Sequence, residues 1–206
     1  MGRNVLVIFA HPTLHRSKLN VHLMKAYDGI ADLEFRELYD LYPKFSIQVK
    51  DEQEALRQAD IIIWHHPLYW YNVPPLLKHW QDMVLSYGFA YGNHGDALAG
   101  KKLLSVITTG GTRSSYQASG SNRFKLKDLL KPQAQTAYHC GMEYLTPYLI
   151  FDAQAHEVLG KTAQLKTDLH NLVLSLQKWS DSDPWPLFDE FESLESCPYI
   201  KLKELR

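Results

Sequence analysis

The sequence has little of what marks several protein classes, and each scarcity excludes something. Its 206 residues contain two cysteines, Cys140 and Cys197, too few for a disulfide framework, which favours a reducing intracellular compartment. The formal net charge of −1 removes the electrostatic reason to expect a nucleic-acid partner. No apolar run approaches the roughly 20 residues that span a bilayer, and no signal-peptide pattern precedes the first strand-like run. We therefore expect a cytoplasmic globular protein, with Cys140 as a buried, unreactive thiol.

Several catalytic motifs are also missing. The chain has no G-x-S-x-G elbow of a serine hydrolase, and the loop at residues 11–20 has no glycine. That loop is therefore neither a dinucleotide-binding G-x-G-x-x-G motif nor a Walker phosphate loop. Ten histidines are present, but no cysteine or carboxylate completes a ligand set with His11 and His15 or with His65 and His66. We expect no metal site.

What the sequence does have is an alternation of apolar runs and amphipathic stretches. The run at residues 5–10 is uninterrupted, as in a strand buried on both faces of a parallel sheet. Strands are predicted at residues 5–10, 33–39, 61–64, 103–108 and 144–151, and helices at 19–30, 51–59, 74–84, 132–140 and 165–179. This alternation predicts an α/β fold, a doubly wound sheet of five parallel strands with helices on both faces. The short second strand favours the flavodoxin-like order 2-1-3-4-5.

The composition changes near the C-terminus. The segment 181–206 is rich in acidic and aromatic side chains, and it contains no basic residue before Lys201. We expect one α/β domain at residues 1–180, followed by this acidic, aromatic tail. The tail is expected to pack on its own domain or on a second subunit, and a partner-binding motif is the alternative. Pro147, inside the last predicted strand, indicates a sheet edge.

The loop after the first predicted strand carries a predicted anion site. Ser17 stands where a helix-capping hydroxyl would sit. Free N–H groups of residues 18–20 would then point out of the helix start, with the helix dipole behind them. Such an arrangement suits phosphate, with charge added by Arg16 and Lys18 and a hydrogen bond from His11. Plain helix capping by Ser17 is the alternative.

Three large aromatic residues, Tyr69, Trp70 and Tyr71, follow the third predicted strand. Loops normally carry small polar residues, so these side chains need an explanation. Because the loop follows a buried strand, it should lie at the carboxyl edge of the sheet, where ligands bind in open α/β folds. Stacking on a flat ligand explains the aromatic residues, and packing against a dimer partner is the alternative.

A third loop, Thr108 to Gly111, follows the fourth predicted strand. Its two glycines allow a positive φ or a close approach of the backbone to a ligand, and their N–H groups could bind a carbonyl or an oxyanion. A tight turn is the alternative. In a 2-1-3-4-5 sheet the first, third and fourth strands are neighbours, so the three loops meet at one crevice. A molecule with a phosphate, a flat ring and a ring edge of hydrogen-bond acceptors fits all three loops, and flavin mononucleotide (FMN) has these parts.

Short strings spread over residues 5–150 carry a resemblance to a known family. They are Ala10-His11-Pro12 with Ser17 and Asn20, then 38–43, 66–78, 88–92, 108–111 and 138–141. In this order and spacing the chain resembles the flavodoxin-like NAD(P)H:quinone oxidoreductases. Within that family it most resembles the Kef ancillary oxidoreductases of glutathione-gated potassium-efflux systems.

The resemblance implies an NAD(P)H dehydrogenase (quinone) that transfers a hydride, two electrons at a time, by a ping-pong mechanism. It also implies a flavin, with FMN preferred to FAD because no adenosine site is visible, a quinone or other electrophile as acceptor, and a homodimer with its sites at the interface. The cofactor-binding residues carried over by position are His11, Ser17, Lys18, Leu19, Asn20, Leu68, Tyr69, Trp70, Tyr71, Thr108, Thr109, Gly110 and Gly111.

Four catalytic residues are expected. The resemblance places Tyr91 and Tyr116 on the substrate side. As a mechanism, we expect Gly110 and Gly111 to stabilise negative charge at the reduced ring edge, and Tyr116 to orient the acceptor or relay a proton. Animal members of the family have a histidine six residues after the second tyrosine, whereas this chain has Asn122 there. An amide can hydrogen-bond but cannot become a cation, so a charge relay through this position is in doubt.

Two other functions stay open. The protein could be mainly a regulatory subunit of a potassium-efflux transporter, peripheral on the inner face of the cell membrane, with a secondary reductase activity. It could also be a single-electron flavodoxin carrier. Such carriers tend to be strongly acidic, whereas this chain has 22 basic and 23 acidic side chains, so the carrier ranks below the other two.

Overall fold

The computed structural model describes residues 2–158, 160–180 and 186–190. The strands of this part are β1 (Val5–Phe9), β2 (Leu33–Glu37), β3 (Ile61–Pro67), β4 (Lys102–Thr108), β5 (Glu143–Tyr144) and β6 (Tyr148–Ile150). Its α-helices are α1 (Asn20–Leu23), α2 (Leu38–Leu41), α3 (Val49–Gln58), α4 (Pro75–Val84), α5 (Leu126–His139), α6 (Ala153–Val158) and α7 (Thr162–Lys178). Short 3₁₀ turns lie at Leu14–Arg16, Met24–Tyr27, Arg113–Tyr116 and Phe188–Glu190.

The strands form one parallel sheet in the order β2-β1-β3-β4-β5, with β6 also paired to β4. This confirms the predicted fold class and strand order. The predicted fifth strand is divided into β5 and β6, and Pro147 lies in the interruption. Proline has no N–H to give to the ladder, which explains why pairing with β4 stops there and resumes at Tyr148.

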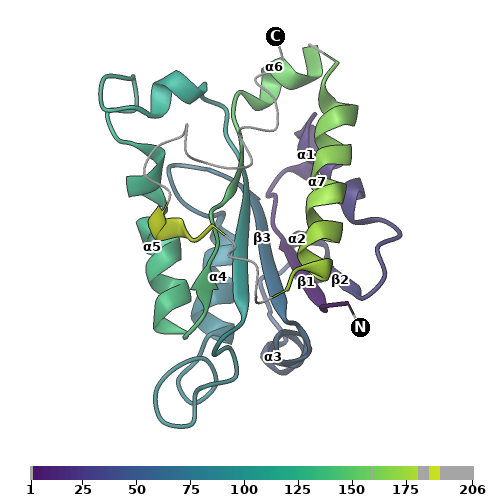
Figure 1. Cartoon of the computed structure of the whole chain (residues 1–206), viewed down its shortest axis with the longest axis vertical. Helices are drawn as coiled ribbons and strands as arrows, with labels where there is room; N and C mark the ends of the chain where they lie inside the picture. Colours follow the sequence, from purple (N-terminus) through teal and green to yellow (C-terminus); the bar gives the residue numbers. More distant parts are fainter. Residues whose placement is uncertain (1, 159, 181–185, 191–206) are drawn as a thin grey trace.

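Helices cover both faces of the sheet (Figure 1). On one face α7 packs against α1 and the 3₁₀ turn after it, whereas α3 and α4 pack together on the other face, which α5 also covers. Every residue of β1, β3 and β4 is buried. This double covering is the reason that these strands are apolar runs instead of alternating patterns.

Several helix boundaries differ from the prediction. Helix α5 begins at Leu126, ahead of the predicted start at Pro132, so the proline lies inside the helix. Proline is common in the first turn of helices, which made position 132 look like a start. Gly141 ends the segment at a φ of 71°, as a helix-terminating glycine should. Burial raises the pKa of Cys140 to about 11, so this residue stays a neutral thiol at neutral pH, as we expected.

The first predicted helix, residues 19–30, is the other clear difference. The α-helical part, α1, is a single turn, and the chain continues as a 3₁₀ turn to Tyr27. The second strand also stops at Glu37, short of the predicted Tyr39, because the Glu37 carboxylate accepts the N–H of Asp40 and caps α2. Helix α6 was not predicted.

A buried carboxylate holds the segment between β2 and α3. Glu52, in the first turn of α3, is fully buried, and its Oε1 accepts from Arg36 Nη2 at 2.6 Å and Arg36 Nε at 2.9 Å. Tyr42 donates to the same oxygen, and Trp80 Nε1 donates to Oε2 at 2.8 Å. Both carboxylate oxygens are therefore occupied, as a buried charge requires.

The described end of the chain packs on the domain. Thr146 N donates to Pro186 O at 2.8 Å, and the Phe188 ring lies 5.1 Å from that of Tyr144. Tyr138 Oη donates to Asp189 Oδ2 at 3.0 Å. Cys197 and the rest of the predicted tail lie outside the described residues, so the domain boundary at residue 180 stays a prediction.

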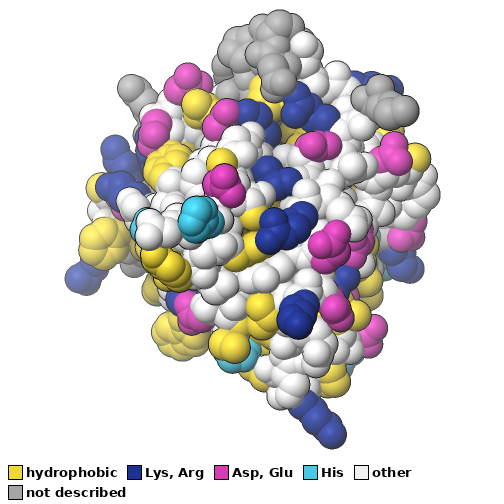
Figure 2. All heavy atoms as spheres, turned by 90° about the horizontal axis from the view of Figure 1, so that it is seen from below, with side chains coloured by type: hydrophobic (Ala, Val, Ile, Leu, Met, Phe, Trp, Pro, Cys, Tyr) yellow, Lys and Arg dark blue, Asp and Glu magenta, His cyan; other side chains and the backbone are white. Residues whose placement is uncertain are grey.

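The end of the molecule opposite α6 carries mixed charges. Figure 2, which views this end, shows lysine and arginine side chains interspersed with aspartate and glutamate. No helix within the described part of the chain is long and apolar enough to cross a membrane.

Candidate functional site

A cleft of about 1270 Å³ lies at the carboxyl edge of the sheet, and all three predicted loops line it. Most of the predicted cofactor-binding and catalytic residues are among its lining residues. These are His11, Ser17, Lys18, Asn20, Leu68, Tyr69, Trp70, Tyr71, Thr108, Thr109, Gly110, Gly111 and Tyr116. The adjacency of β1, β3 and β4 brings the loops together, as the strand order predicts.

Asn20 joins the first loop to the third. Its backbone N–H and its Nδ2 donate to Ser17 Oγ at 3.0 and 3.1 Å, and the same Nδ2 donates to Thr108 Oγ1 at 3.1 Å. The N–H of Asn20 is thus not free for an anion, which corrects the predicted helix-start site. Because α1 is only one turn long, its dipole is also small. An anion here would depend chiefly on the side chains of Arg16 and Lys18.

His11 is buried at the floor of the first loop. Its Nδ1 accepts the N–H of Thr13 at 3.3 Å, and its Nε2 lies 3.5 Å from Tyr69 Oη. Burial lowers the pKa of His11, although a backbone hydrogen bond partly opposes this shift, so the ring is neutral at pH 7. With Nδ1 accepting, the proton of the neutral ring is on Nε2, and His11 is a hydrogen-bond donor toward Tyr69.

The aromatic loop is a tight reverse turn with a strained backbone. Tyr69 and Asn72 exchange two backbone hydrogen bonds, at 3.1 and 3.0 Å. The two residues between them have positive φ angles, 48° at Trp70 and 64° at Tyr71. This is the pattern of a type I′ turn, which normally uses Asn-Gly because bulky side chains are unfavourable there. Such strain costs on the order of 1–3 kcal/mol per residue and clusters at functional sites.

The side chain of Trp70 is 93% exposed, and those of Tyr69 and Tyr71 are about half exposed. The three rings therefore stand at the rim of the cleft instead of in the core. An aromatic ring that is left in water and held by a strained backbone is suited to cover a flat ligand or to contact another protein.

The two glycines of the third loop allow a ligand to approach the backbone closely. Neither Gly110 nor Gly111 has a positive φ. A Cβ on Gly110 would meet nothing within 4 Å, whereas one on Gly111 would lie 2.7 Å from Ser115 Oγ and 3.0 Å from a Tyr116 ring carbon. Among the described residues, no acceptor receives the N–H of either glycine. Both donors are thus available to a ligand in the cleft.

Tyr116 is the buried phenol of the cleft. Burial raises the pKa of Tyr116, and a hydrogen bond with Thr109 partly opposes that shift. The phenol therefore keeps its proton at neutral pH and can donate it in a hydrogen bond. Its ring packs against Phe151 at 5.9 Å, which holds it in place.

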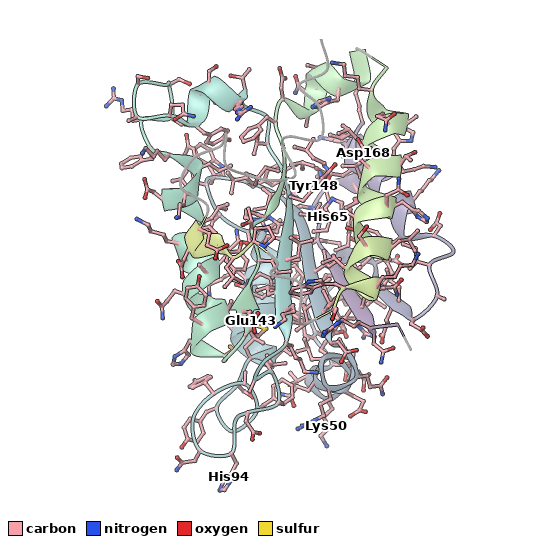
Figure 3. All side chains as sticks on the ribbon, in the orientation of Figure 1. Lys50, His65, His94, Glu143, Tyr148 and Asp168 are labelled. Atoms are coloured by element: carbon pink, nitrogen blue, oxygen red, sulfur yellow. The ribbon has the colours of Figure 1, made fainter. Side chains whose placement is uncertain are left out.

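Two predicted residues do not line this cleft. Leu19 is 2% exposed, and its side chain lies in the core. Tyr91 belongs to the loop before β4, at the amino end of the strands, and its ring lies 4.7 Å from that of His139. His94, on the same loop, lies at the lower end of the molecule in Figure 3, away from the carboxyl edge. A role for Tyr91 at this cleft would need a second copy of the chain.

The structure also adds lining residues that the sequence analysis did not select. They are Thr13, Pro67, Thr112, Ser115, Ser121, Ala153 and Gln154, together with Arg16 and Asn122, which were noted for other reasons. Ala153 and Gln154 come from α6, which was itself not predicted. Thr13, Thr112, Ser115 and Ser121 are small polar residues, for which no periodicity or motif gives a signal, and Pro67 is the last residue of β3.

The charge of the lining has one sign. Arg16 and Lys18 line the cleft, and no aspartate or glutamate does so among the described residues. Beneath it, His65 is fully buried, with Nδ1 2.8 Å from Tyr27 Oη, and burial lowers its pKa to about 3. Figure 3 shows His65 in the interior of the sheet. The cleft thus combines cations, two free N–H groups and exposed rings, which fits a flat molecule that carries an anionic group.

Solved structures similar to this chain have the same fold. General stress protein 14 of Treponema denticola, solved in complex with FMN, is 33% identical, over 84% of this chain and 99% of that one, with a TM-score of 0.79. A chain described as a thermophilic tryptophan halogenase from Streptomycin violaceusniger is 36% identical, over 78% of this chain and 95% of that one, with a TM-score of 0.73.

An NADPH-quinone reductase from P. pentosaceus is 31% identical, over 82% of this chain and 96% of that one, with a TM-score of 0.73. In addition, residues 3–172 match a protein family described as having a flavodoxin-like fold. That match includes every strand in the described part of the chain and the three loops of the cleft. The chain therefore belongs to the family of proteins with a flavodoxin-like fold.

Proposed function

We propose that the protein is an FMN-dependent NAD(P)H:quinone oxidoreductase. The observation that carries this proposal is the cleft itself, where cations, exposed rings and two unused backbone N–H groups meet and where none of the described carboxylates is part of the lining. FMN in general stress protein 14 and the reductase named for P. pentosaceus support it, each at more than 30% identity. The chain described as a tryptophan halogenase is named for other chemistry, so the acceptor class rests on the reductase from P. pentosaceus and on the sequence resemblance.

Different residues of the cleft would bind different parts of the cofactor. Arg16, Lys18 and the hydroxyl of Ser17 would hold the phosphate, and the Trp70–Tyr71 turn would lie against the ring. The N–H groups of Gly110 and Gly111 would bind the ring edge that gains negative charge, by the logic of an oxyanion hole. When bound, the flavin supplies the hydride chemistry, in a ping-pong exchange between NAD(P)H and a quinone or similar electrophile.

The remaining task of the protein is to position donors and to exclude water. Tyr116, which is protonated at neutral pH, would donate a hydrogen bond to the acceptor oxygen from inside the cleft. His11, neutral and buried, would add support from the floor through Tyr69. Asn122 replaces the histidine of the animal enzymes, so no imidazolium is available at that place.

We also propose a homodimer that works in the cytoplasm. Four large apolar residues near or on α4 are exposed, namely Leu41 at 46%, Phe45 at 42%, Met83 at 47% and Tyr87 at 63%. Apolar surface of this kind is typical of an interface. A second copy would also explain Tyr91, which the resemblance assigns to the substrate side although it lies away from the cleft of its own chain. Sedimentation of the protein, with Met83→Asp as the disruptive variant, tests this assembly.

The test of the function is reconstitution with FMN. Purified protein should bind FMN and absorb at ~450 nm, and NADH or NADPH should bleach that band, with colour restored by a benzoquinone. Trp70→Ala should weaken binding and turnover, whereas Asn171→Ala, an exposed position on α7 that does not line the cleft, is the control. Protein that stays colourless after incubation with FMN, or that keeps its colour when NAD(P)H is added, would contradict the proposal.

Activation of a potassium-efflux transporter rests on the sequence resemblance alone. Binding of the protein to membranes that contain such a transporter, with and without Trp70→Ala, separates this role from the reductase. If the variant loses turnover but still activates transport, the regulatory role is the main one. If neither protein binds the membranes, the transporter proposal is wrong.

A further inference from the structure

A hydrogen bond crosses the rim of the cleft between the aromatic turn and the loop after β4. Tyr71 Oη and Asn122 Oδ1 are 3.3 Å apart, and both residues line the cleft. Tyr71 follows β3 and Asn122 follows β4, so the bond connects two separate walls. Among the described residues it is the one side-chain hydrogen bond made by either Trp70 or Tyr71.

Ser115 determines which way the Asn122 amide points. Its hydroxyl donates its single proton to Thr112 O at 2.7 Å, so it can only accept from Asn122 Nδ2, at 3.1 Å. The amide oxygen is thereby turned toward Tyr71, whose phenol proton must be the donor. The backbone of Asn122 is held as well, because its N–H donates to Ser115 O at 3.0 Å.

The aromatic turn needs such a support. Residues with φ angles of 48° and 64° and no glycine persist only where surrounding contacts hold them. Packing supplies little here, because the side chains of Trp70 and Tyr71 are 93% and 47% exposed. Asn122 has what the support requires, since two hydrogen bonds to Ser115 and a half-buried position fix it to the loop after β4.

We propose that Asn122 is a positioning residue that latches Tyr71 and so sets how far the aromatic turn opens to a flat acceptor or nicotinamide. The identity of those molecules rests on the proposed function, whereas the latch is a property of the protein without flavin. With its proton committed to Asn122, Tyr71 holds the rim and does not donate to a bound molecule. Tyr116 and Tyr69 are then the phenols left to donate inside the cleft, since Tyr69 Oη accepts from His11.

The latch is tested first in flavin-free protein, by hydrogen exchange of the Tyr69 and Asn72 amides that close the turn. A net hydrogen bond of ordinary strength corresponds to about a fivefold change in an equilibrium. We expect Tyr71→Phe and Asn122→Ala each to speed exchange about fivefold, and the double variant to add nothing further. Asn171→Ala, an exposed amide on α7, is the matched control and should change nothing. Unchanged exchange in the single variants, or fully additive effects, would overturn the latch.

A kinetic measurement separates positioning from mere stability. With a water-soluble benzoquinone as acceptor, both single variants should raise KM about fivefold and leave kcat within about twofold. The double variant should match the single ones. A loss of kcat with unchanged KM would contradict the positioning role. If the exchange rates respond as expected but no variant or parent reduces quinone, the proposed function fails while the latch stands.

Discussion

Two polar regions of the molecule differ in how their hydrogen-bonding groups are used. Around Glu52, inside the domain, both carboxylate oxygens accept from Arg36, Tyr42 or Trp80. In the cleft, by contrast, the N–H groups of Gly110 and Gly111 have no acceptor among the described residues. The first region is complete without any other molecule, whereas the second is complete only when something enters it.

The two regions also differ in backbone conformation. Glu52 lies in a regular helix, while the cleft holds two aromatic residues at positive φ angles. A buried charge must be fully paired to be tolerated, so the Glu52 region is best explained by stability. Free donors and strain reduce stability, and they persist at sites where a ligand uses them. Unpaired groups at a strand edge therefore indicate function more reliably than buried charges do.

The largest expected effect is on the complete region. Glu52→Ala should lower the free energy of unfolding by about 3–5 kcal/mol, because the buried Tyr42 and Trp80 and the half-buried Arg36 lose the carboxylate to which they donate. Glu54→Ala, an exposed carboxylate on the same helix, should change it by less than about 0.5 kcal/mol. Urea unfolding measures both. If the two variants were equally stable, the contrast between the regions would be lost.

The next effect concerns pH and the buried layer below the cleft. His65 has a pKa of about 3 in the folded protein, held down by burial, and about 6.5 when unfolded. The unfolded chain therefore takes up the proton first, and stability falls as pH drops below about 6.5. At pH 5 this loss amounts to about 2 kcal/mol for one such histidine. His65→Leu should lose correspondingly less stability between pH 7 and pH 5 in urea unfolding; an equal loss in both proteins would refute the assignment.

Gly110 and Gly111 separate binding from stability within the cleft itself. Gly110→Ala places a Cβ in open space, so folding should be unchanged while FMN affinity falls about tenfold, through lost approach to the ring edge. Gly111→Ala should lose stability as well, by about 1–3 kcal/mol, because its Cβ meets Ser115 and Tyr116. Fluorescence titration with FMN and thermal unfolding measure the two quantities. If both variants lost FMN affinity and stability to the same extent, Gly110 and Gly111 would not have separate roles in binding and packing.

The smallest expected effect is a gain in the free energy of unfolding, unlike the losses above. Replacing Trp70→Asn together with Tyr71→Gly supplies the residues that a type I′ turn prefers, and should stabilise the protein by about 1 kcal/mol. The same variant should lose turnover, because the exposed rings are gone. Thermal unfolding and quinone reduction are the measurements. A variant that is both less stable and fully active would show that the aromatic turn serves stability and not function.

Much of the fold follows from local patterns. The uninterrupted apolar runs predicted β1, β3 and β4, and their order predicted that the loops at residues 11–20, 68–71 and 108–111 would meet. Errors occurred where two local signals compete. Pro132 indicated a helix start, yet the contacts of Leu126 and Leu130 with the core extend α5 ahead of it. The anion site at the start of α1 was overestimated, because a one-turn helix cannot be recognised from spacing.

The sheet, its strand order and the set of loops at its carboxyl edge can be predicted from the sequence, since burial on two faces requires runs of apolar residues. The pairing of groups within those loops follows from the tertiary structure. Asn20 is hydrogen-bonded to Thr108 and Tyr71 to Asn122, whereas the N–H groups of the two glycines have no acceptor among the described residues. Such bonds join residues far apart in the chain. Whether they form depends on differences of a few tenths of an ångström in the donor–acceptor distance, which no local periodicity encodes.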